Sequence, residues 1–179
     1  MAPVISAISP VQGPTAGGTA VTVTGTGFTG VTAVMFGSAS ATFVVVNSTK
    51  ITTTAPAGSG SVSVTVTTPG GTSNGVTYTY VAAPVVSGLS PTSGPAVGGN
   101  TVTITGTGFT GAASVSFGSV SASFTVVSAT QITATAPAGT GSVSVTVTTP
   151  GGTSNSATYT YVAAPVVSSI SPTQGPSVG

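Results

Sequence analysis

The chain has 179 residues, of which 39% are hydrophobic and only 1% are charged, whereas an average soluble domain is about one-quarter charged. It contains one lysine and no Arg, Asp, Glu, His or Cys, which gives a formal net charge of +1. This composition excludes nucleic acid as a partner, because phosphate binding needs Lys or Arg, and it supplies neither a strong metal ligand nor a His or carboxylate for acid–base catalysis.

The chain starts with MAPVISAISP, in which Val4–Ser9 is the first expected strand. This stretch lacks both the basic and the apolar region of a secretory signal peptide, so no such signal is visible. No later run of about 18 or more apolar residues occurs, as a transmembrane helix would need. We therefore expect no insertion into a membrane.

Alternation of apolar and small polar residues predicts strands throughout the chain. The segments AVTVT (Ala20–Thr24) and SVSVTVT (Ser61–Thr67) place Val at every second position, which is typical of strands with one buried and one solvated face. Glu, Lys, Arg and Leu, which favour helices, are nearly absent. The strands expected in the first unit are Val4–Ser9, Thr19–Thr24, Ala33–Phe36, Ala41–Asn47, Lys50–Thr54, Ser61–Thr67 and Val76–Val81.

The stretch GTGFTG at Gly25–Gly30 follows the second of these strands and returns letter for letter at Gly106–Gly111. It has the G-x-G-x-x-G spacing of dinucleotide-binding folds, in which a helix follows the glycines and an acidic residue lies about 20 positions later. Here the next residues, VTAVMFG, have the pattern of another strand, and the chain has no acidic residue. We therefore interpret the motif as a glycine-rich connection that turns Phe28 and Phe109 into the core, and we predict no cofactor.

The turn at Asn47–Lys50 holds the candidates for chemistry. A Ser–Lys pair, Ser48 with Lys50, is the one nucleophilic arrangement that this composition allows. Because Gln131 stands in place of the lysine 81 residues later, we interpret Lys50 as a solvated surface residue and predict no catalytic residue. Asn47-Ser48-Thr49 is also a formal glycosylation sequon, and its use stays open.

Proline–glycine turns connect the last strands of the unit, and tyrosines occupy the final strand. PAG at Pro56–Gly58 and PGG at Pro69–Gly71 predict tight turns, because Pro presets the first φ and Gly accepts a positive φ. We expect alternate residues of the final strand to pack inward and their neighbours to cap the domain junction. The alternative is a sugar-binding platform formed by Tyr78, Tyr80, Tyr159 and Tyr161.

The whole pattern repeats after 81 residues without insertion or deletion. APVISAISPVQGP from Ala2 is restated as APVVSGLSPTSGP from Ala83, and the register holds through Phe36/Phe117. A third copy opens at Ala164 and stops after sixteen residues. Many short strands with frequent turns predict an all-β chain of tandem β-sandwiches with about seven strands each. We place the units at residues 1–82 and 83–163, with a first-strand fragment of a third repeat at 164–179.

Each unit resembles an IPT/TIG domain, an immunoglobulin-like fold of transcription factors, receptors and bacterial surface proteins. The first unit matches in ISPVQGPTAGGTAVTVTGTGF, VMFG, STKITTTAP, SVSVTVTTPGGTSN and TYTY, and the second in LSPTSGPAVGGNTVTITGTGF, VSFG, ATQITATAP and TYTY. The resemblance covers both units almost end to end and implies tandem immunoglobulin-like β-sandwiches in which GTGF marks the end of a strand. Members of the family that bind DNA use basic loops, and nothing here matches those loops.

The resemblance and the lack of charge together imply a non-enzymatic structural or interaction protein. We expect units of an extracellular fibre, stalk or self-assembling filament of a bacterium or phage, located outside the cell or on its surface. A net charge near zero gives little repulsion between copies, so the expected partners are other copies of the chain or further repeats of the same array. The alternative is a carbohydrate-binding or adhesin accessory module with a polysaccharide as its ligand.

The segment Val166, Val167, Ser168, Ser169 and Ile170 has the pattern of a first strand without its sandwich. Left alone, such a segment should be disordered. It is therefore a candidate intersubunit strand, which would add to a neighbouring chain by strand addition. The alternative is a longer array that has been cut within its next repeat.

Overall fold

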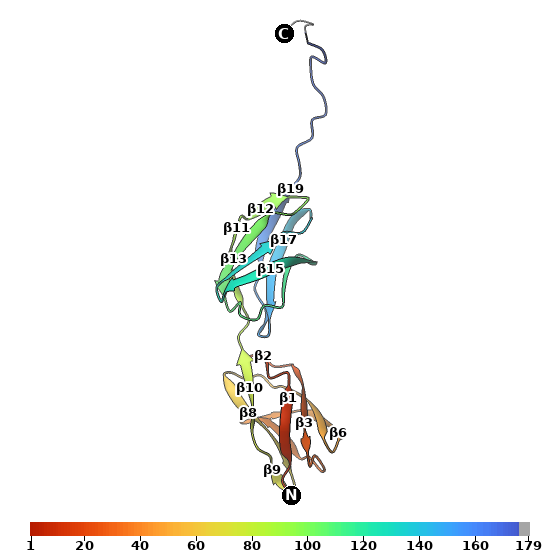
Figure 1. The fold of residues 1–179 in the computed structure, drawn as a ribbon, viewed down its shortest axis with the longest axis vertical. Coiled ribbons are helices and arrows are strands. Elements are labelled where there is room, and N and C mark those ends of the chain that lie inside the picture. Colours follow the sequence, from red (N-terminus) through yellow and green to blue (C-terminus); the bar gives the residue numbers. More distant parts are fainter. Residues whose placement is uncertain (176–179) are drawn as a thin grey trace.

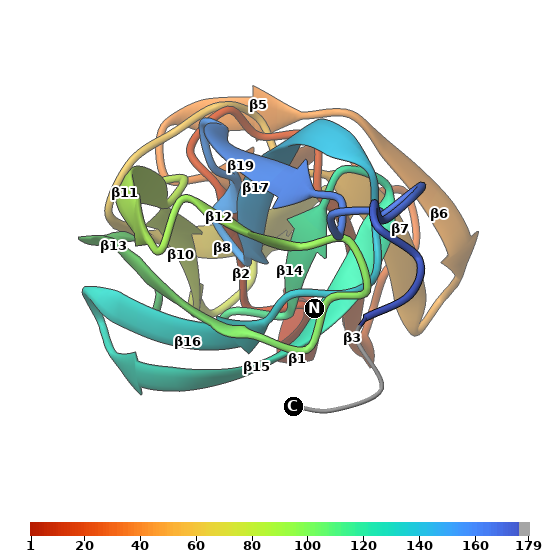
Figure 2. The same ribbon diagram turned by 90° about the horizontal axis from the view of Figure 1, so that it is seen from above.

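The computed structural model describes residues 1–175, and every regular element among them is a β-strand. Two β-sandwiches follow one another along the long axis, and an extended tail leaves the second one (Figure 1). In the view along that axis, the second sandwich lies over the first (Figure 2). No helix of the length and apolar character needed to cross a membrane occurs in the described part of the chain. The predicted all-β chain of tandem sandwiches is confirmed.

The first sandwich consists of two facing sheets. Its strands are β1 (Val4–Ser9), β2 (Gln12–Pro14), β3 (Ala20–Thr26), β4 (Ala33–Phe36), β5 (Ala39–Ala41), β6 (Phe43–Asn47), β7 (Lys50–Thr54), β8 (Ser61–Thr68), β9 (Gly71–Thr72) and β10 (Val76–Val81). One sheet has the order β1-β3-β7-β6, and the other has the order β2-β10-β8-β4-β5 with β9 beside β8. Strand β2 runs parallel to β10, so β1 and β2 lead toward the end of the sandwich from which the chain leaves.

The second sandwich repeats this layout with one difference. Its strands are β11 (Val85–Ser90), β12 (Ser93–Pro95), β13 (Thr101–Thr107), β14 (Ser114–Phe117), β15 (Val120–Ser128), β16 (Gln131–Thr135), β17 (Gly141–Thr149), β18 (Gly152–Thr153) and β19 (Ala157–Val162). The long strand β15 pairs with β14 near its start and with β16 further on. It thereby joins both sheets into one path, β11-β13-β16-β15-β14-β17-β19-β12, with β18 beside β17.

All seven strands expected for the first unit are present, but three differ in extent, and of these Ser61–Thr67 differs only by continuing to Thr68. The strand expected at Ala41–Asn47 is interrupted at Thr42. There the Thr53 hydroxyl donates a hydrogen bond to the Thr42 carbonyl oxygen (2.7 Å), whereas the second unit has Ala134 in place of Thr53 and a continuous strand. The strand expected at Thr19–Thr24 runs from Ala20 to Thr26 instead, so the glycine motif begins inside a strand.

The glycine motif brings β1 close to β3 and turns a phenylalanine inward. A Cβ on Gly25 would overlap the Val4 carbonyl oxygen and the Phe28 ring, and Gly27 has a φ of +76° that favours glycine. Phe28 is 1% exposed and its counterpart Phe109 is fully buried. The glycines therefore serve strand packing, as the sequence interpretation held.

Each sandwich has its own core of Val, Ile, Phe and Tyr side chains from both sheets. At its centre Tyr78 packs edge-on against Phe36 and Tyr80, with both pairs of ring centroids 5.1 Å apart. The second unit repeats this trio 81 residues later at 5.2 Å. Edge-to-face aromatic pairs are favourable beyond the area that they bury, so the trio stabilises the packing of β10 and β4, which flank β8 in one sheet.

An asparagine side chain holds the first strand of each sandwich. Asn74 Oδ1 accepts a hydrogen bond from the Ile5 amide (2.9 Å), and Asn74 Nδ2 donates one to the Ile5 carbonyl oxygen (3.0 Å). Asn155 does the same with Val86, at 2.9 Å for both bonds. The register of β1 shifts between Ile5 and Ala7, and such a bulge leaves backbone groups outside the ladder. The asparagine clamp satisfies these backbone groups. Because it bonds only to backbone atoms, it can hold either Ile5 or Val86.

The central tyrosines of the two cores differ in how their hydroxyl groups are satisfied. In the second unit the Tyr159 hydroxyl donates to Asn100 Oδ1 (3.0 Å) and accepts from Asn100 Nδ2 (2.8 Å). The first unit has Thr19 in place of Asn100, and the Tyr78 hydroxyl is buried without a partner among the described residues. A buried polar group without a partner destabilises a fold by about 1–3 kcal/mol.

Replacing Phe36 or Phe117 by Ala should lower the free energy of unfolding of the affected unit by about 3–5 kcal/mol, because both rings are 2% exposed. Calorimetry of the full chain would show one of two transitions moving to lower temperature. Val44→Ala is the matched control, since Val44 is 65% exposed and its loss should leave both transitions in place. An unchanged melt of Phe36→Ala would contradict the assigned core.

Tyr159→Phe should destabilise the second unit by about 1–3 kcal/mol, because it leaves the Asn100 amide without its partner. Tyr78→Phe should cost nothing in the first unit, since the hydroxyl it removes is unpaired. Conversely, Thr19→Asn should stabilise the first unit by about 1 kcal/mol by supplying the missing partner. Chemical denaturation of the three variants measures all of these changes, and equal losses for the two Tyr→Phe variants would refute this account.

Candidate functional site

The turn with the sequence-based candidates for chemistry closes the hairpin between β6 and β7. Asn47 Oδ1 accepts hydrogen bonds from the Thr49 amide (2.9 Å) and the Thr49 hydroxyl (2.8 Å). Ser48 and Lys50 are both exposed, so Lys50 lacks the desolvating pocket that activates a lysine. We assign the turn a structural role, and the use of Asn47 for glycosylation stays a prediction.

The four tyrosines form no sugar-binding platform. Tyr78 and Tyr159 are fully buried, and Tyr80 and Tyr161 are 6% exposed, so no ring face is available to a ligand. Burial raises the pKa of Tyr80 and of Tyr161 above its ordinary value, and the neighbouring Tyr78 or Tyr159 raises it further. The platform alternative is therefore wrong.

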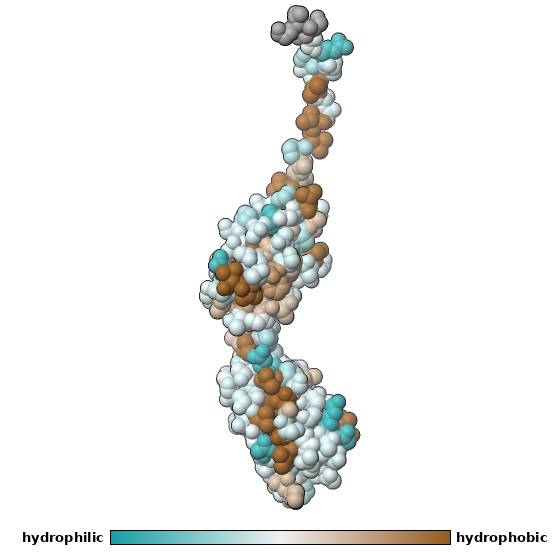
Figure 3. All heavy atoms as spheres, viewed as in Figure 1, coloured by the Kyte–Doolittle hydropathy of each residue, from teal (hydrophilic) through white to brown (hydrophobic). Residues whose placement is uncertain are grey.

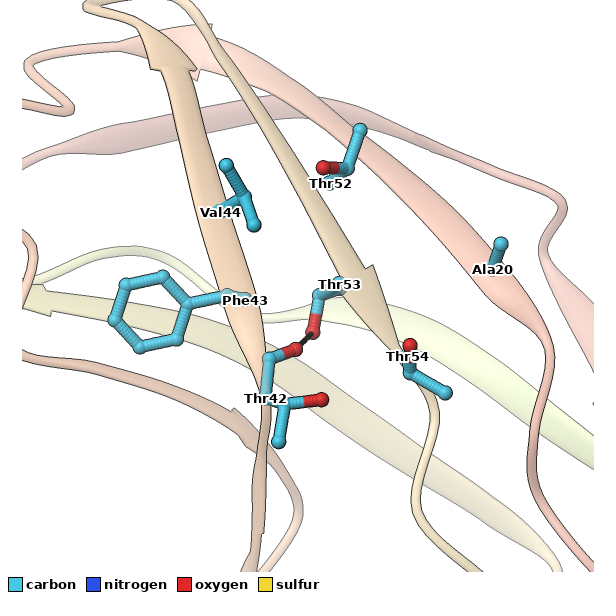
Figure 4. A pocket seen from close by; sticks show the side chains of 7 residues that line it. All are labelled: Ala20, Thr42, Phe43, Val44, Thr52, Thr53 and Thr54. Atoms are coloured by element: carbon cyan, nitrogen blue, oxygen red, sulfur yellow. Dashed lines mark hydrogen bonds between the residues drawn. The ribbon is translucent and has the colours of Figure 1, made fainter.

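A shallow groove recurs at the same place on both sandwiches. In the first, it has a volume of about 280 Å³ beside the break between β5 and β6, and Figure 4 shows its lining of Ala20, Thr42, Phe43, Val44, Thr52, Thr53 and Thr54. In the second, it has a volume of about 230 Å³ and is lined by Thr101, Ser123, Phe124, Thr125, Thr133, Ala134 and Thr135. These side chains offer hydroxyl groups and apolar surface but no charge, so the groove supplies no acid, base or metal ligand.

The linker between the sandwiches is short and anchored at both ends. Strand β10 ends at Val81, and only Ala82 and Ala83 precede Pro84, which is buried. Proline fixes its own φ near −65°. Gly108 lies against Pro84, so that a Cβ there would be 3.3 Å from the Pro84 Cα. The linker therefore enters the second sandwich as part of its packed structure.

The PGG turn of the second sandwich lies on this linker. A Cβ on Gly151 would overlap the Ala82 carbonyl group, and Gly151 is buried. The equivalent turn of the first sandwich, Pro69–Gly71, is exposed at all three residues, and Gly70 there faces Met1. The two turns have the same sequence and meet equivalent residues, so the greater burial of the second turn accompanies its additional contact with Val81 of the first sandwich.

The second sandwich has an open apolar groove at the end where the tail leaves it. On the first sandwich, the linker begins at the equivalent place. It has a volume of about 410 Å³ and is lined by Gly94, Pro95, Ala96, Val97, Val162, Ala163, Ala164 and Pro165. Val162 is 55% exposed, whereas its counterpart Val81 is half-buried at the junction. The groove therefore has the residues that form the junction on the first sandwich, and the described part of the chain leaves it open.

The predicted intersubunit strand lies beyond this groove and is unpaired in the described part of the chain. Residues 163–175 form no strand and are exposed throughout, and apolar side chains follow one another along the tail in the space-filling view (Figure 3). Val167 and Ile170 are 79% and 67% exposed, whereas their counterparts Ile5 and Ile8 are 3% and 5% exposed. The role as an intersubunit strand stays a prediction.

The sequence interpretation missed the residues that fix the junction and the first strand. It assigned no role to Gly151 or to the two asparagines of the clamp, Asn74 and Asn155. The identical stretch TPGGTSN in both units was a usable signal, because it keeps two glycines and an asparagine at fixed places in a loop. Nothing in it indicated that the partners lie 69 residues away in the first strand.

Comparison with solved structures finds the fold in larger proteins. The plexin A4 extracellular region with domains 1 to 10 is 24% identical, with a TM-score of 0.60 over 95% of this chain and 16% of that chain. The same region with domains 1 to 8 gives 24% and 0.57 over 89% of this chain and 18% of that chain. This chain thus spans less than a fifth of those chains, and the likeness shows the fold alone.

A third solved structure is SGBP-B from a xyloglucan utilization locus of Bacteroides uniformis. It is 27% identical over 90% of this chain and 49% of that chain, with a TM-score of 0.41, from which we infer nothing about this chain's ligands. Comparison with curated proteins finds no match.

A family model assigns both sandwiches. The IPT/TIG domain model matches residues 3–80 and again residues 84–161. These ranges lie within the predicted units, whose limits of 1–82 and 83–163 stay a prediction. The matched residues make up most of the chain, which therefore belongs to the IPT/TIG family.

Proposed function

We propose that the chain is a structural spacer of an extracellular fibre, stalk or filament, in which immunoglobulin-like units in series set a fixed distance and direction. IPT/TIG domains are interaction and structural modules. The observation that carries the proposal is the contact between the buried Gly151 turn and the linker. The equivalent turn of the first sandwich contacts Met1, and what distinguishes the junction is that the contacted residues, Val81 and Ala82, are the end of the first sandwich's last strand and the start of the linker.

The junction resists bending in two ways. Pro84 restricts the backbone where the chain enters the second sandwich, and the turn at Gly151 supports the Ala82 carbonyl from the side. Val81 is covered at the same time, in contrast to Val162 at the free end. Inter-domain interfaces that are small leave the domains mobile by default, so the stiffness we propose depends on the linker's own packing.

The composition supports a setting outside the cell. Without carboxylate, imidazole or thiol side chains, the fold has no ion pairs for salt to screen and no such groups for acid to protonate. Its stability therefore depends on apolar packing and neutral hydrogen bonds. Such a fold tolerates an environment whose pH and salt are not controlled.

A polysaccharide ligand was the alternative that the sequence left open. The buried tyrosines remove the platform on which one form of that alternative depended. Binding at another part of the surface stays a prediction, which a pull-down on insoluble glycans tests. We propose the spacer role because a contact in the structure supports it directly.

Gly151→Ala should loosen the junction, because its Cβ would take the space of the Ala82 carbonyl and displace the linker. Small-angle scattering of the dilute full chain should then show a broader distribution of interdomain distances, with both units still folded. Gly70→Ala is the matched control, since the same atom would meet the Met1 carbonyl group, which lies outside the connection between the two sandwiches. Identical scattering from wild type and Gly151→Ala would reject the stiff spacer.

The free energy of unfolding should be constant from about pH 3 to pH 9, because no Asp, Glu, His or Cys side chain is present to titrate. Above about pH 10 it should fall. Tyrosines of the unfolded chain ionise near their ordinary pKa, while the raised pKa of Tyr80 and of Tyr161 keeps the native phenols protonated. The unfolded state then binds fewer protons than the native state, so stability decreases as pH rises.

Melting temperature against pH, followed by circular dichroism, tests this dependence. Tyr161→Phe serves as the control, because the Tyr161 hydroxyl has no hydrogen-bond partner among the described residues and its removal should weaken the alkaline fall of the second unit alone. A melting temperature that drops between pH 7 and pH 4 would disprove the expected acid tolerance.

A further inference from the structure

The tail has the sequence of the first two strands of the first sandwich. Residues 164–175 are identical to residues 2–13 at nine of twelve positions. The three differing pairs are Val167/Ile5, Ser169/Ala7 and Thr173/Val11. Ala7 and Val11 are exposed in the folded unit, so only the first pair changes a buried side chain, and it does so by one methylene group.

The site that holds β1 would accept the tail. Its inward side chains, Ile5 and Ile8, correspond to Val167 and Ile170. Val86, the counterpart of Val167 in β11, shows that a valine fits the equivalent site, since it is 4% exposed and held by its own asparagine clamp. Because the Asn74 clamp binds only the backbone, it makes no distinction between Ile5 and Val167.

The tail cannot take the place of a first strand within its own chain in the native direction. Strand β12 runs parallel to β19 and directly follows β11, so β11 starts at the end of the sandwich opposite the tail. Spanning the six residues of β19 takes about 20 Å, whereas the three residues Ala163–Pro165 reach about 10 Å at most. The first sandwich lies further away still (Figure 1). The acceptor must therefore be a second copy.

We propose that the tail of one copy replaces β1 and β2 in the first sandwich of a second copy, so that chains join end to end. Ala163 and Ala164 would then occupy the place of Ala82 and Ala83, with the exposed Pro69–Gly71 turn of the second copy against them. The second copy's first sandwich would cover the apolar groove at Val162. The inference rests on the junction of the proposed spacer, which this exchange reproduces between two molecules.

The balance of contacts makes the assembly concentration-dependent. When the tail replaces β1, the second copy's own β1 becomes exposed and an almost identical strand becomes buried. The free energies of these two sets of strand contacts therefore nearly cancel. The gain is one additional junction, in which a half-buried valine replaces one that is 55% exposed. A small gain against the entropy of association favours monomers in dilute solution and joined chains at high concentration. Weakening the native β1 shifts this balance toward exchange.

Sedimentation velocity of the full chain over a range of concentrations is the test. The variant Ile5→Ser with Ile8→Ser weakens the native strand and should form chains at a concentration at least tenfold lower than wild type. Adding Val167→Ser and Ile170→Ser should return this variant to monomers. Adding Val166→Ser instead should change nothing, because its counterparts Val4 and Val85 are 53% and 50% exposed.

Assembly that persists after the tail substitutions would overturn the proposal. So would an Ile5→Ser, Ile8→Ser chain that stays monomeric at all concentrations while its second sandwich melts normally. If the first sandwich of that variant is unfolded, a peptide of residues 164–179 should restore its melting transition, and no restoration overturns the proposal as well. Scattering of the Gly151→Ala variant in dilute solution is independent of these outcomes, so the spacer and the exchange can fail separately.

Discussion

Each sandwich depends on two facing rows of apolar side chains, because the chain has no carboxylate side chain with which its single lysine could pair. Val, Ile, Phe and Tyr at alternate positions supply these rows, and burial of apolar surface is proportional to area and has no direction. Direction must then come from neutral hydrogen bonds. The Asn74 clamp sets the place of β1, and Asn100 sets the place of Tyr159. In this fold, amide side chains perform the orienting work that ion pairs perform elsewhere.

The repeat also lets one turn sequence make contacts within a unit and between units. The PGG turn ends a hairpin in both sandwiches, but only in the second does it also support a linker. A Cβ at either glycine would overlap neighbouring backbone, which is that of Ala82 at Gly151 and that of Met1 at Gly70. The same turn therefore contacts the residues before the first strand in both units, and in the second unit these residues are the linker between the sandwiches.

The strands, the core phenylalanines and the family could be predicted from the sequence, because a period of two and a repeat of 81 residues are local or self-evident signals. The clamp and the turn that packs against the linker could not. Asn74 reaches Ile5 across 69 residues, and Gly151 meets a linker that no periodicity points to. The break at Thr42 also escaped prediction, and it coincides with a hydrogen bond from the hydroxyl of Thr53 in the adjacent strand.

More than one segment of this chain meets the requirements of a first strand in this fold. The clamp binds backbone atoms, and the inward positions require two apolar side chains, which β1, β11 and the tail all carry. Charge does not discriminate either, because edge strands that proteins normally protect with lysine carry exposed valines here, as β6 does at Val44 and Val46. What distinguishes a native strand from an incoming one is its covalent tether. A tether acts through effective concentration, so an array built from such units can be extended by a strand of the same chain or by one from another.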